Sequence, residues 1–257
     1  MTRLLLIALA AVLVVAATVL LSLPATWLNL LMEQQTDGRL SLGDPQGRVW
    51  RGSAFAGAAV DSGAPITPVL PGRFHWTLSP LLLLGVVEAR IDNPDALDHT
   101  VTVSGNWYAW QLGPASVQLP AERLAALGAP LNTVLPSGRM QLSWSALTLR
   151  PHASGIDIDG RLWLELTDIA SALSPVKPLG AYRLQFDWRG ARAQLTLSTL
   201  SGPLQMSGHG EIVNGRLQFS GEAWAQPGQE QRLAVLLNLL GQQRQRENRR
   251  VVALEFQ

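Results

Sequence analysis

Four histidines are the residues of this chain best suited to metal binding or acid–base chemistry: His75, His99, His152 and His209. None of them forms an HExxH motif or another pair with the sequence spacing of two metal ligands on one face of a helix. The chain has no cysteine, which excludes thiol catalysis, disulfides and cysteine-based zinc sites. We expect each histidine to have a solvent-facing or hydrogen-bonded structural role.

Motifs for nucleophilic or phosphate chemistry are also missing. No Gly-x-Ser-x-Gly elbow occurs, and the single lysine, Lys177, lies in Ser-Pro-Val-Lys-Pro instead of behind a glycine-rich loop. Gly208-His-Gly210 is half of a dinucleotide fingerprint, but strand-like residues follow it. Asp157-Ile-Asp159-Gly160 resembles the start of a calcium loop without its later acidic ligands, so we expect a hairpin turn there. The sequence predicts no enzyme, no cofactor and no metal site.

The N-terminal segment Leu4–Leu23 has no charged residue. Twenty helical residues span about 30 Å, the thickness of the hydrocarbon core of a bilayer. The stretch is longer than the apolar part of a signal peptide, and Leu23 stands where a cleavage site after Ala25 would need a small residue. Trp27 follows at the position of an interfacial aromatic residue. We therefore expect a permanent transmembrane helix over 4–23, not a cleaved signal peptide.

Charge predicts the orientation of this helix and excludes one class of partner. Arg3 and the free amine are the nearby positive charges, so residues 1–3 are expected in the cytoplasm. We expect 24–38 to be a linker and 39–257 to be one β-rich domain outside the cytoplasm, where a cysteine-free chain is suited to an oxidising space. A net charge of only +1 gives no electrostatic footprint for nucleic acid.

Most of the chain has the pattern of short strands separated by turns. It contains nine tryptophans, 23 glycines and 16 prolines, which favours strands and turns over long helices. Alternation of apolar and polar residues predicts half-buried strands. The clearest are Arg139–Leu149, Arg161–Thr167, Arg183–Trp188, Gln194–Leu200 and Arg216–Ser220. Less regular ones are Gly47–Gly57, Arg73–Leu78, Val86–Ile91 and Val101–Trp110, with a last strand at Val251–Phe256.

Dipeptides between these strands predict hairpins. Asp159-Gly160 and Asn214-Gly215 favour two-residue turns, because both central residues must adopt positive φ. Arg189-Gly190 and Ser207-Gly208 are further candidates. The sequence thus predicts a mainly β fold: a single transmembrane helix followed by a domain of curved, mostly antiparallel sheet.

One or two short helices complete the expected fold. Pro120–Leu127 has a proline suited to a first turn, and Gly128 is suited to end the helix. Glu230–Leu240 places four leucines on one stripe, which we expect to pack on the sheet; the alternative is a helix that binds a partner.

The tryptophans have two interpretations. Trp50, Trp76, Trp144 and Trp188 are expected to fill the core, each with a partner for its N–H. The alternative is exposure for docking to a partner, for which Trp107 and Trp110 are the best examples, because aromatic residues are frequent at binding hot spots.

Several glycine, tryptophan and proline elements occur in an order that resembles the type II secretion system protein N family (GspN). Gly47-Arg-Val-Trp50-Arg-Gly52 is similar to that family's Gly-x-x-Trp-x-Gly element, and Trp76-Thr-Leu-Ser-Pro80 follows. Later elements are Trp188-Arg-Gly190-Ala191 and Gly202-Pro203-Leu204, which leads to Gly208. These ten numbered glycine, tryptophan and proline residues are the candidate structural or interaction residues.

The resemblance implies an inner-membrane component of the Gram-negative machine that exports folded proteins across the outer membrane. Its partners would be the lipid bilayer and other inner-membrane subunits of that machine, and its sheet domain would be periplasmic. Contacts through the transmembrane helix and through an exposed sheet edge would be its mechanism. The alternative is an anchored periplasmic protein that binds or transfers lipid in an apolar groove of its sheet. No other small-molecule ligand is expected.

Overall fold

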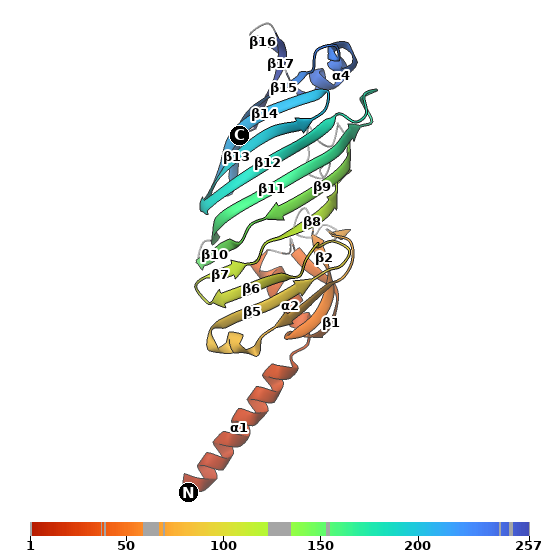
Figure 1. Ribbon diagram of the computed structural model, residues 1–257. Coiled ribbons are helices and arrows are strands. Elements are labelled where there is room, and N and C mark those ends of the chain that lie inside the picture. The colour runs from red at the N-terminus through yellow and green to blue at the C-terminus, as the bar shows by residue number, and fades with distance from the viewer. Residues whose placement is uncertain are drawn as a thin grey trace. The chain divides into compact units, whose positions relative to one another are not determined.

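The computed structural model describes residues 2–36, 38, 40–58, 67–68, 70–122, 135–152, 155–241, 243–246 and 249–256. The chain divides into two compact units, Met1–Trp110 and Gln111–Gln257. Strands are the main element of the chain as a whole, and they pair antiparallel (Figure 1). The predicted mainly β class with few helices is therefore confirmed.

Unit 1 begins with two helices, α1 (Thr2–Ser22) and α2 (Thr26–Gln35). Helix α2 occupies most of the segment that the sequence suggested as a linker. The leucine-, alanine- and valine-rich sequence of α1 explains its helical backbone, since most of these residues are good helix formers. In the described part of the chain, no helix meets the criteria of length and hydropathy for a membrane span.

The sheet of unit 1 has the strand order β1-β2-β4-β5-β6. The 3-10 helix η1 (Pro80–Leu84) connects β4 to β5, and the short β3 pairs with the end of β2. The strands are β1 (Leu40–Arg48), β2 (Arg51–Ala58), β3 (Thr67–Pro68), β4 (Phe74–Leu78), β5 (Val86–Asp92) and β6 (Val101–Asn106). The short β7 (Trp110–Leu112) begins at the last residue of unit 1. The predictions for 73–78, 86–91 and the first part of 101–110 are confirmed.

One strand prediction in unit 1 is wrong. Gly47–Gly57 is not a single strand, because the chain reverses at Val49 and Trp50 and Arg48 pairs with Arg51. Gly47 has a φ of +86°, which helps to turn the chain just before the reversal. The preceding segment, rich in turn residues, forms strand β1.

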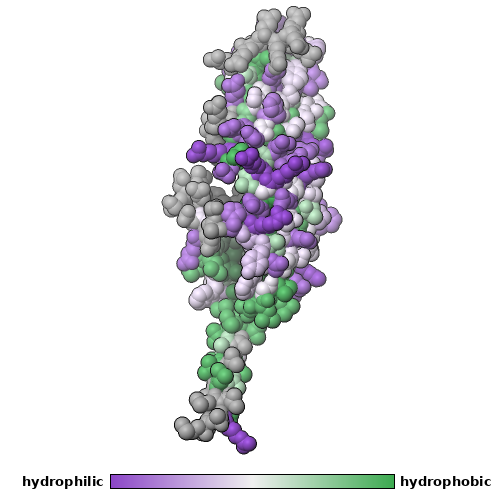
Figure 2. Space-filling model, turned by 90° about the vertical axis from the view of Figure 1, so that its left-hand side faces the viewer, coloured by the Kyte–Doolittle hydropathy of each residue, from purple (hydrophilic) through white to green (hydrophobic). Residues whose placement is uncertain are grey.

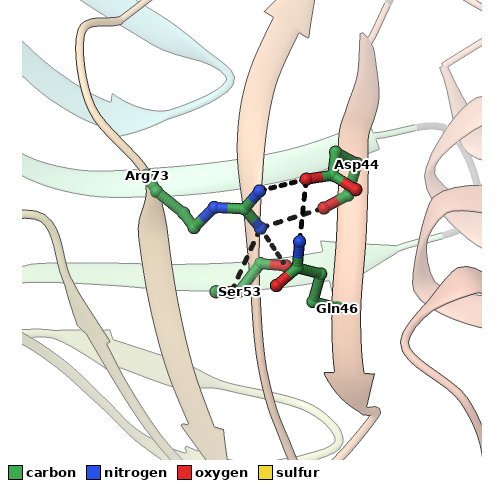
Figure 3. A network of polar contacts seen from close by, with 4 residues as sticks. All are labelled: Asp44, Gln46, Ser53 and Arg73. Carbon is green, nitrogen blue, oxygen red and sulfur yellow. Dashed lines mark hydrogen bonds and ion pairs between the residues drawn. The ribbon is translucent and has the colours of Figure 1, made fainter.

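A polar network holds an irregular part of β1, where the register with β2 shifts between Gly43 and Gln46 (Figure 3). The guanidinium of Arg73 forms an ion pair with Asp44 and donates to the Asp44 carbonyl (3.0 Å) and the Ser53 hydroxyl (3.2 Å). Gln46 donates to the Asp44 carboxylate at 2.9 Å. The network thus ties the irregular part of β1 to the start of β2 and to the residue before β4.

The unit 2 sheet is a meander with the order β8-β9-β11-β12-β13-β14-β15-β17-β16, and β10 pairs with β11 beside β9. The elements are β8 (Ala115–Pro120), β9 (Pro136–Trp144), β10 (Leu147–His152), β11 (Gly155–Ser171), β12 (Gly180–Gly190), β13 (Arg192–Ser201), β14 (Leu204–Val213), β15 (Arg216–Ala225), α4 (Glu230–Leu240), β16 (Gln243–Arg246) and β17 (Arg249–Phe256). The predicted strands at 161–167, 183–188, 194–200, 216–220 and 251–256 are confirmed.

Two of the four predicted hairpin turns exist. Asn214-Gly215 connects β14 to β15 with φ values of +50° and +78°, as the two-residue turn requires. Arg189 and Arg192 pair across the turn at Gly190 and Ala191. The turn between β13 and β14 is at Gly202 and Pro203, so the prediction at Ser207-Gly208, which lies inside β14, is wrong.

The predicted turn at Asp159-Gly160 is also wrong, because both residues lie inside β11. Opposite them, the predicted strand 139–149 is interrupted between Trp144 and Leu147, where its register with β11 shifts by one residue. This bulge transfers the buried position from the even residue Met140 to the odd residue Leu147. A Cβ on Gly160 would lie 2.5 Å from the Leu147 side chain, so the glycine makes room for the bulge.

The core of unit 2 lies between the sheet and α4. The predicted helix Glu230–Leu240 is thus confirmed, and its leucines pack on the sheet as expected. Leu233, Leu236 and Leu237 of α4 are buried against Tyr182, Leu204 and Val252 on the sheet, among other residues. The other predicted helix, 120–127, lies largely outside the described residues, and Pro120 is the last residue of β8.

Candidate functional site

The residues with potential chemistry are dispersed on the surface. All four histidines are exposed, and two face a carboxylate: His99 lies 2.9 Å from Asp98, and His152 lies 3.5 Å from Asp157. Asp159 forms an ion pair with Arg150. Over the described ranges, no three His, Cys, Asp or Glu residues are grouped to bind a metal.

The most organised site lies where the turn of the β1–β2 hairpin meets the end of α1. We call this site the junction and define it as Leu20–Ala25 together with Gly47–Gly52. The Val49 N–H donates to the Leu23 carbonyl at 2.9 Å, and the Ala25 N–H donates to the Gly47 carbonyl at 3.1 Å. The indole N–H of Trp50 donates to the Leu20 carbonyl at 2.8 Å. The hairpin therefore binds backbone groups at the end of α1 and directly after it.

Glycines allow the close approach of chains in the junction. Gly47 and Gly52 lie directly opposite each other in the hairpin. A Cβ on Gly52 would lie 2.6 Å from the Gln46 carbonyl oxygen and 2.6 Å from the Trp76 ring. The Trp76 N–H in turn donates to the Val49 carbonyl at 2.9 Å. Trp76 thus covers Gly52 and supports the turn that contacts α1.

Pro80 connects the junction to η1. The Leu78 N–H donates to the Trp50 carbonyl at 2.8 Å, and Pro80 begins η1 two residues later. The hydroxyl of Ser79 accepts from the Leu81 N–H at the N-terminus of η1. Five of the ten predicted site residues are thereby at or beside the junction: Gly47, Trp50, Gly52, Trp76 and Pro80.

The other five predicted site residues support the sheet of unit 2 and do not form one site. Gly190 and the pair Gly202 and Pro203 lie in turns at opposite ends of β13. Trp188 is half-buried and lies opposite Gly160. A Cβ on Gly208 would lie 2.4 Å from the Phe219 ring, so this glycine makes space for an aromatic side chain.

The burial of the tryptophans lies between what a core role and what a docking role would require. Trp50, Trp76, Trp144 and Trp188 are all half-buried, and the N–H of Trp144 donates to the Gly113 carbonyl at 2.8 Å. Trp107 is 57% exposed and Trp27 is 53% exposed. Of the two suggested docking residues, Trp110 is half-buried.

The sheet of unit 2 has one apolar and one polar face. Directly paired residues form a row across the strands on one face: Val117, Leu142, Leu164, Leu184 and Leu197. A second row on the same face is Trp144, Leu162, Phe186 and Leu195. The opposite face includes the row Gln118, Gln141, Glu165, Arg183 and Ser198, in which Arg183 forms a salt bridge of 2.7 Å with Glu165.

A hollow in unit 2 opens among polar and apolar side chains, with Leu195 and Phe219 beside the polar ones. It has a volume of about 760 Å³ and is lined by residues of β13, β14, β15 and β17, including His209, Glu211, Gln218 and Glu255. Because this lining mixes charged, polar and apolar groups, the hollow indicates no single class of ligand.

The fold and the junction define a β-sheet protein of two units that carries an N-terminal apolar helix. The model of the family "Type II secretion system (T2SS), protein N" matches residues 38–252, which include all ten predicted site residues. The chain therefore belongs to the type II secretion system protein N family and takes part in type II secretion. Neither the curated proteins nor the solved structures contain a match to it.

Proposed function

We propose that this protein is a non-enzymatic inner-membrane subunit of the type II secretion machine and acts through protein–protein contacts. Helix α1 would cross the inner membrane with the N-terminus in the cytoplasm, and the sheets of both units would be periplasmic. The uncharged sequence Leu4–Leu23 and the helical backbone of Thr2–Ser22 support the anchor. Family membership supports the role in secretion.

The junction is the observation that carries this proposal. A flexible linker would let α1 rotate independently of the unit 1 sheet. The junction instead binds Leu20 of α1 through the Trp50 indole, and it binds Leu23 and Ala25 directly after the helix through backbone hydrogen bonds. The orientation of the helix about its own axis is then coupled to unit 1. A neighbouring subunit that packs on the alanines of α1, such as Ala10 and Ala11, would thereby also orient unit 1.

Photo-crosslinking in living cells tests the protein contact. A photoreactive amino acid is placed at single positions of α1, including Ala10 and Ala11, and at Arg3 as a position outside the apolar segment. We expect adducts with another inner-membrane secretion subunit from one face of α1, and reduced secretion on deletion of the gene. Lipid adducts alone from every position of α1, with normal secretion on deletion, would refute the proposal.

Coupling through the junction is tested with Trp50→Phe, which keeps the aromatic ring and removes the N–H that reaches Leu20. We expect weaker or redistributed crosslinks from α1. Trp163→Phe is the matched control, because Trp163 is another half-buried tryptophan but lies on strand β11. Equal crosslinking in both variants would show that the Trp50 bond does not orient the helix.

A second candidate function is lipid binding on the apolar face of unit 2. The observation that favours it is the partial exposure of Leu142, Leu162, Leu164, Leu184 and Phe186, which lie in the two apolar rows. Contiguous partly exposed apolar side chains are suited to an acyl chain, because each then loses contact with water.

Neighbouring residues of one strand provide the test of this second function. A photoreactive amino acid at Leu162 or Leu164 lies on the apolar face, and one at Trp163 lies on the opposite face. Lipid adducts at Leu162 and Leu164 but not at Trp163 would support lipid binding. Equal labelling at all three positions, or none, would exclude it.

A further inference from the structure

Unit 1 exposes a cluster of large apolar side chains on two neighbouring loops, which we call the apolar rim. Leu84 is 79% exposed and Tyr108 is 81% exposed. The other members are Leu81, Leu83, Val86 and Trp107, each more than 40% exposed. Figure 2 shows hydrophobic residues gathered where the body of unit 1 meets α1. A cluster of this kind usually marks a binding surface.

Hydrogen bonds hold the two loops of the rim in shape. The indole N–H of Trp107 donates to the Leu82 carbonyl at 2.9 Å and so connects the β6–β7 loop to η1. The side chain of Asn106 accepts from the N–H groups of Tyr108 (2.8 Å) and Ala109 (3.0 Å). Gly85, with a φ of +90°, ends η1. Several backbone groups are hydrogen-bonded within the loops while the apolar side chains are exposed, so the exposure is built into the local structure.

The rim lies at the same end of the unit 1 sheet as the junction. Leu78, the last residue of β4, is hydrogen-bonded to Trp50, whose indole N–H reaches Leu20 near the end of α1. Residue Pro80 then begins η1, and Val86 after it pairs with Asn106 at the start of the second loop. Trp27, the second residue of α2, is also exposed close to this end.

The chemistry of the rim fits the boundary between lipid headgroups and acyl chains. Residues 79–87 and 106–110 contain no ionisable side chain other than the phenol of Tyr108. Leucines are suited to the acyl region, and tryptophan and tyrosine are enriched at membrane interfaces, where one part of the ring system is apolar and another is wet. The N–H of Trp107 is already bonded, so its ring can enter apolar surroundings without an unpaired donor.

We propose that the apolar rim inserts into the periplasmic surface of the bilayer that α1 crosses. This inference rests on the membrane anchor proposed above. The junction places the rim beside the point where α1 leaves the hydrocarbon core, so the rim and α1 contact the same lipid leaflet. Unit 1 is then held against the membrane at two places, which restricts its tilt as well as its distance.

Site-specific fluorescence on the full chain tests this insertion, since the chain has no cysteine of its own. Leu84→Cys and Tyr108→Cys are labelled with the polarity-sensitive probe NBD and reconstituted in vesicles of phosphatidylethanolamine and phosphatidylglycerol. We expect blue-shifted emission and strong quenching by lipids that carry a spin label near the headgroup. Both positions are highly exposed, so neither substitution removes a buried contact.

Two further labels separate the possible failures. His99→Cys is the matched control, since it lies on the surface in the β5–β6 connection, at the opposite end of those two strands. Val12→Cys in α1 reports the anchor by quenching from a spin label deep in the acyl chains. If Val12 is quenched but Leu84 and Tyr108 are no more quenched than His99, the rim proposal is overturned and the anchor stands. No quenching at Val12 would overturn the anchor and, with it, the rim proposal. Shielding of Leu84 only after other secretion subunits are added would identify a protein surface instead and also overturn it.

Discussion

The indole N–H of Trp76 donates a 2.9 Å hydrogen bond to the carbonyl of Val49, in the turn of the neighbouring hairpin. The same indole ring lies over Gly52, so one side chain both bonds the turn and fills the space that glycine leaves. Trp50, beside Val49 in this turn, then reaches Leu20 at the end of α1. The Gly-x-x-Trp-x-Gly element therefore has a structural explanation: its glycines let the chains approach, and its tryptophan contacts the helix.

Gly52→Ala should destabilise unit 1 by about 1–3 kcal/mol, the usual cost of overpacking. The new Cβ would meet two backbone oxygens within 3 Å as well as the Trp76 ring, and backbone cannot move aside as a flexible side chain can. Gly43→Ala in the same hairpin is the control, because its Cβ would have only ordinary contacts at 3.6 Å and beyond. Denaturant unfolding of the full chain in detergent measures both, and equal stability of the two variants would contradict the close-approach argument.

Gly208→Ala should destabilise unit 2 through the ring of Phe219. Because the clash is mainly with one side chain, Phe219→Leu should relieve part of it, and the double variant should be more stable than the sum of the two single effects. We expect a coupling of about 1 kcal/mol in a double-mutant cycle followed by thermal unfolding. Strict additivity would indicate that the Gly221 backbone, 2.9 Å from the same Cβ, is the dominant obstacle.

Unit 2 shows which parts of the fold the sequence could predict and which it could not. The strands of unit 2 were predictable because one sheet face is apolar and the other polar, which gives a two-residue period in Arg183–Trp188 and Gln194–Leu200. Gly208 and Gly160 were misread as turn residues, since the partners that require glycine there, Phe219 and Leu147, lie on other strands. Asn214-Gly215 has a local reason for its turn, because both of its residues have positive φ.

The candidate site was predictable in part. Motif spacing singled out Gly47, Trp50 and Gly52, but the sequence suggested one strand where the structure has a hairpin, because the turn residues Val49 and Trp50 are typical of strands. Of the apolar rim, only Trp107 was suggested as an exposed docking residue, and the leucines of η1 were missed. Their signal was the run of four leucines between Pro80 and Gly85, which has no alternation and is not flanked by charges.

Helix α2 protects an edge of the unit 1 sheet, and Asn29 is the residue that does so directly. Its side-chain oxygen accepts a 2.6 Å hydrogen bond from the Leu42 N–H of β1. Asn29→Ala should therefore reduce stability by about 1 kcal/mol and accelerate amide hydrogen exchange at Leu42. Asn29→Asp keeps an acceptor oxygen and should keep the protection of Leu42. Rapid exchange at Leu42 in both variants would show that the amide is protected by something other than this oxygen.

Tyr182 should make the stability of unit 2 fall at alkaline pH. Its hydroxyl donates to the Leu204 carbonyl at 3.0 Å in the buried core, and burial raises the pKa of this phenol above its ordinary value of 10.0. Above pH 10 the unfolded chain releases the phenolic proton while the folded chain keeps it. The unfolded state then binds fewer protons, so the free energy of unfolding decreases as pH rises through and beyond 10.

Urea unfolding at pH 8 and at pH 11 measures this effect in the full chain. Tyr182→Phe removes the ionisable group, so its own stability should depend less on pH over this interval than that of the wild type. Tyr182→Phe should also be less stable than the wild type at pH 8, because the Leu204 carbonyl loses its donor. Tyr108→Phe, on an exposed ring, is the control and should keep the full alkaline decrease. An unchanged decrease in Tyr182→Phe would assign the alkaline sensitivity to other groups.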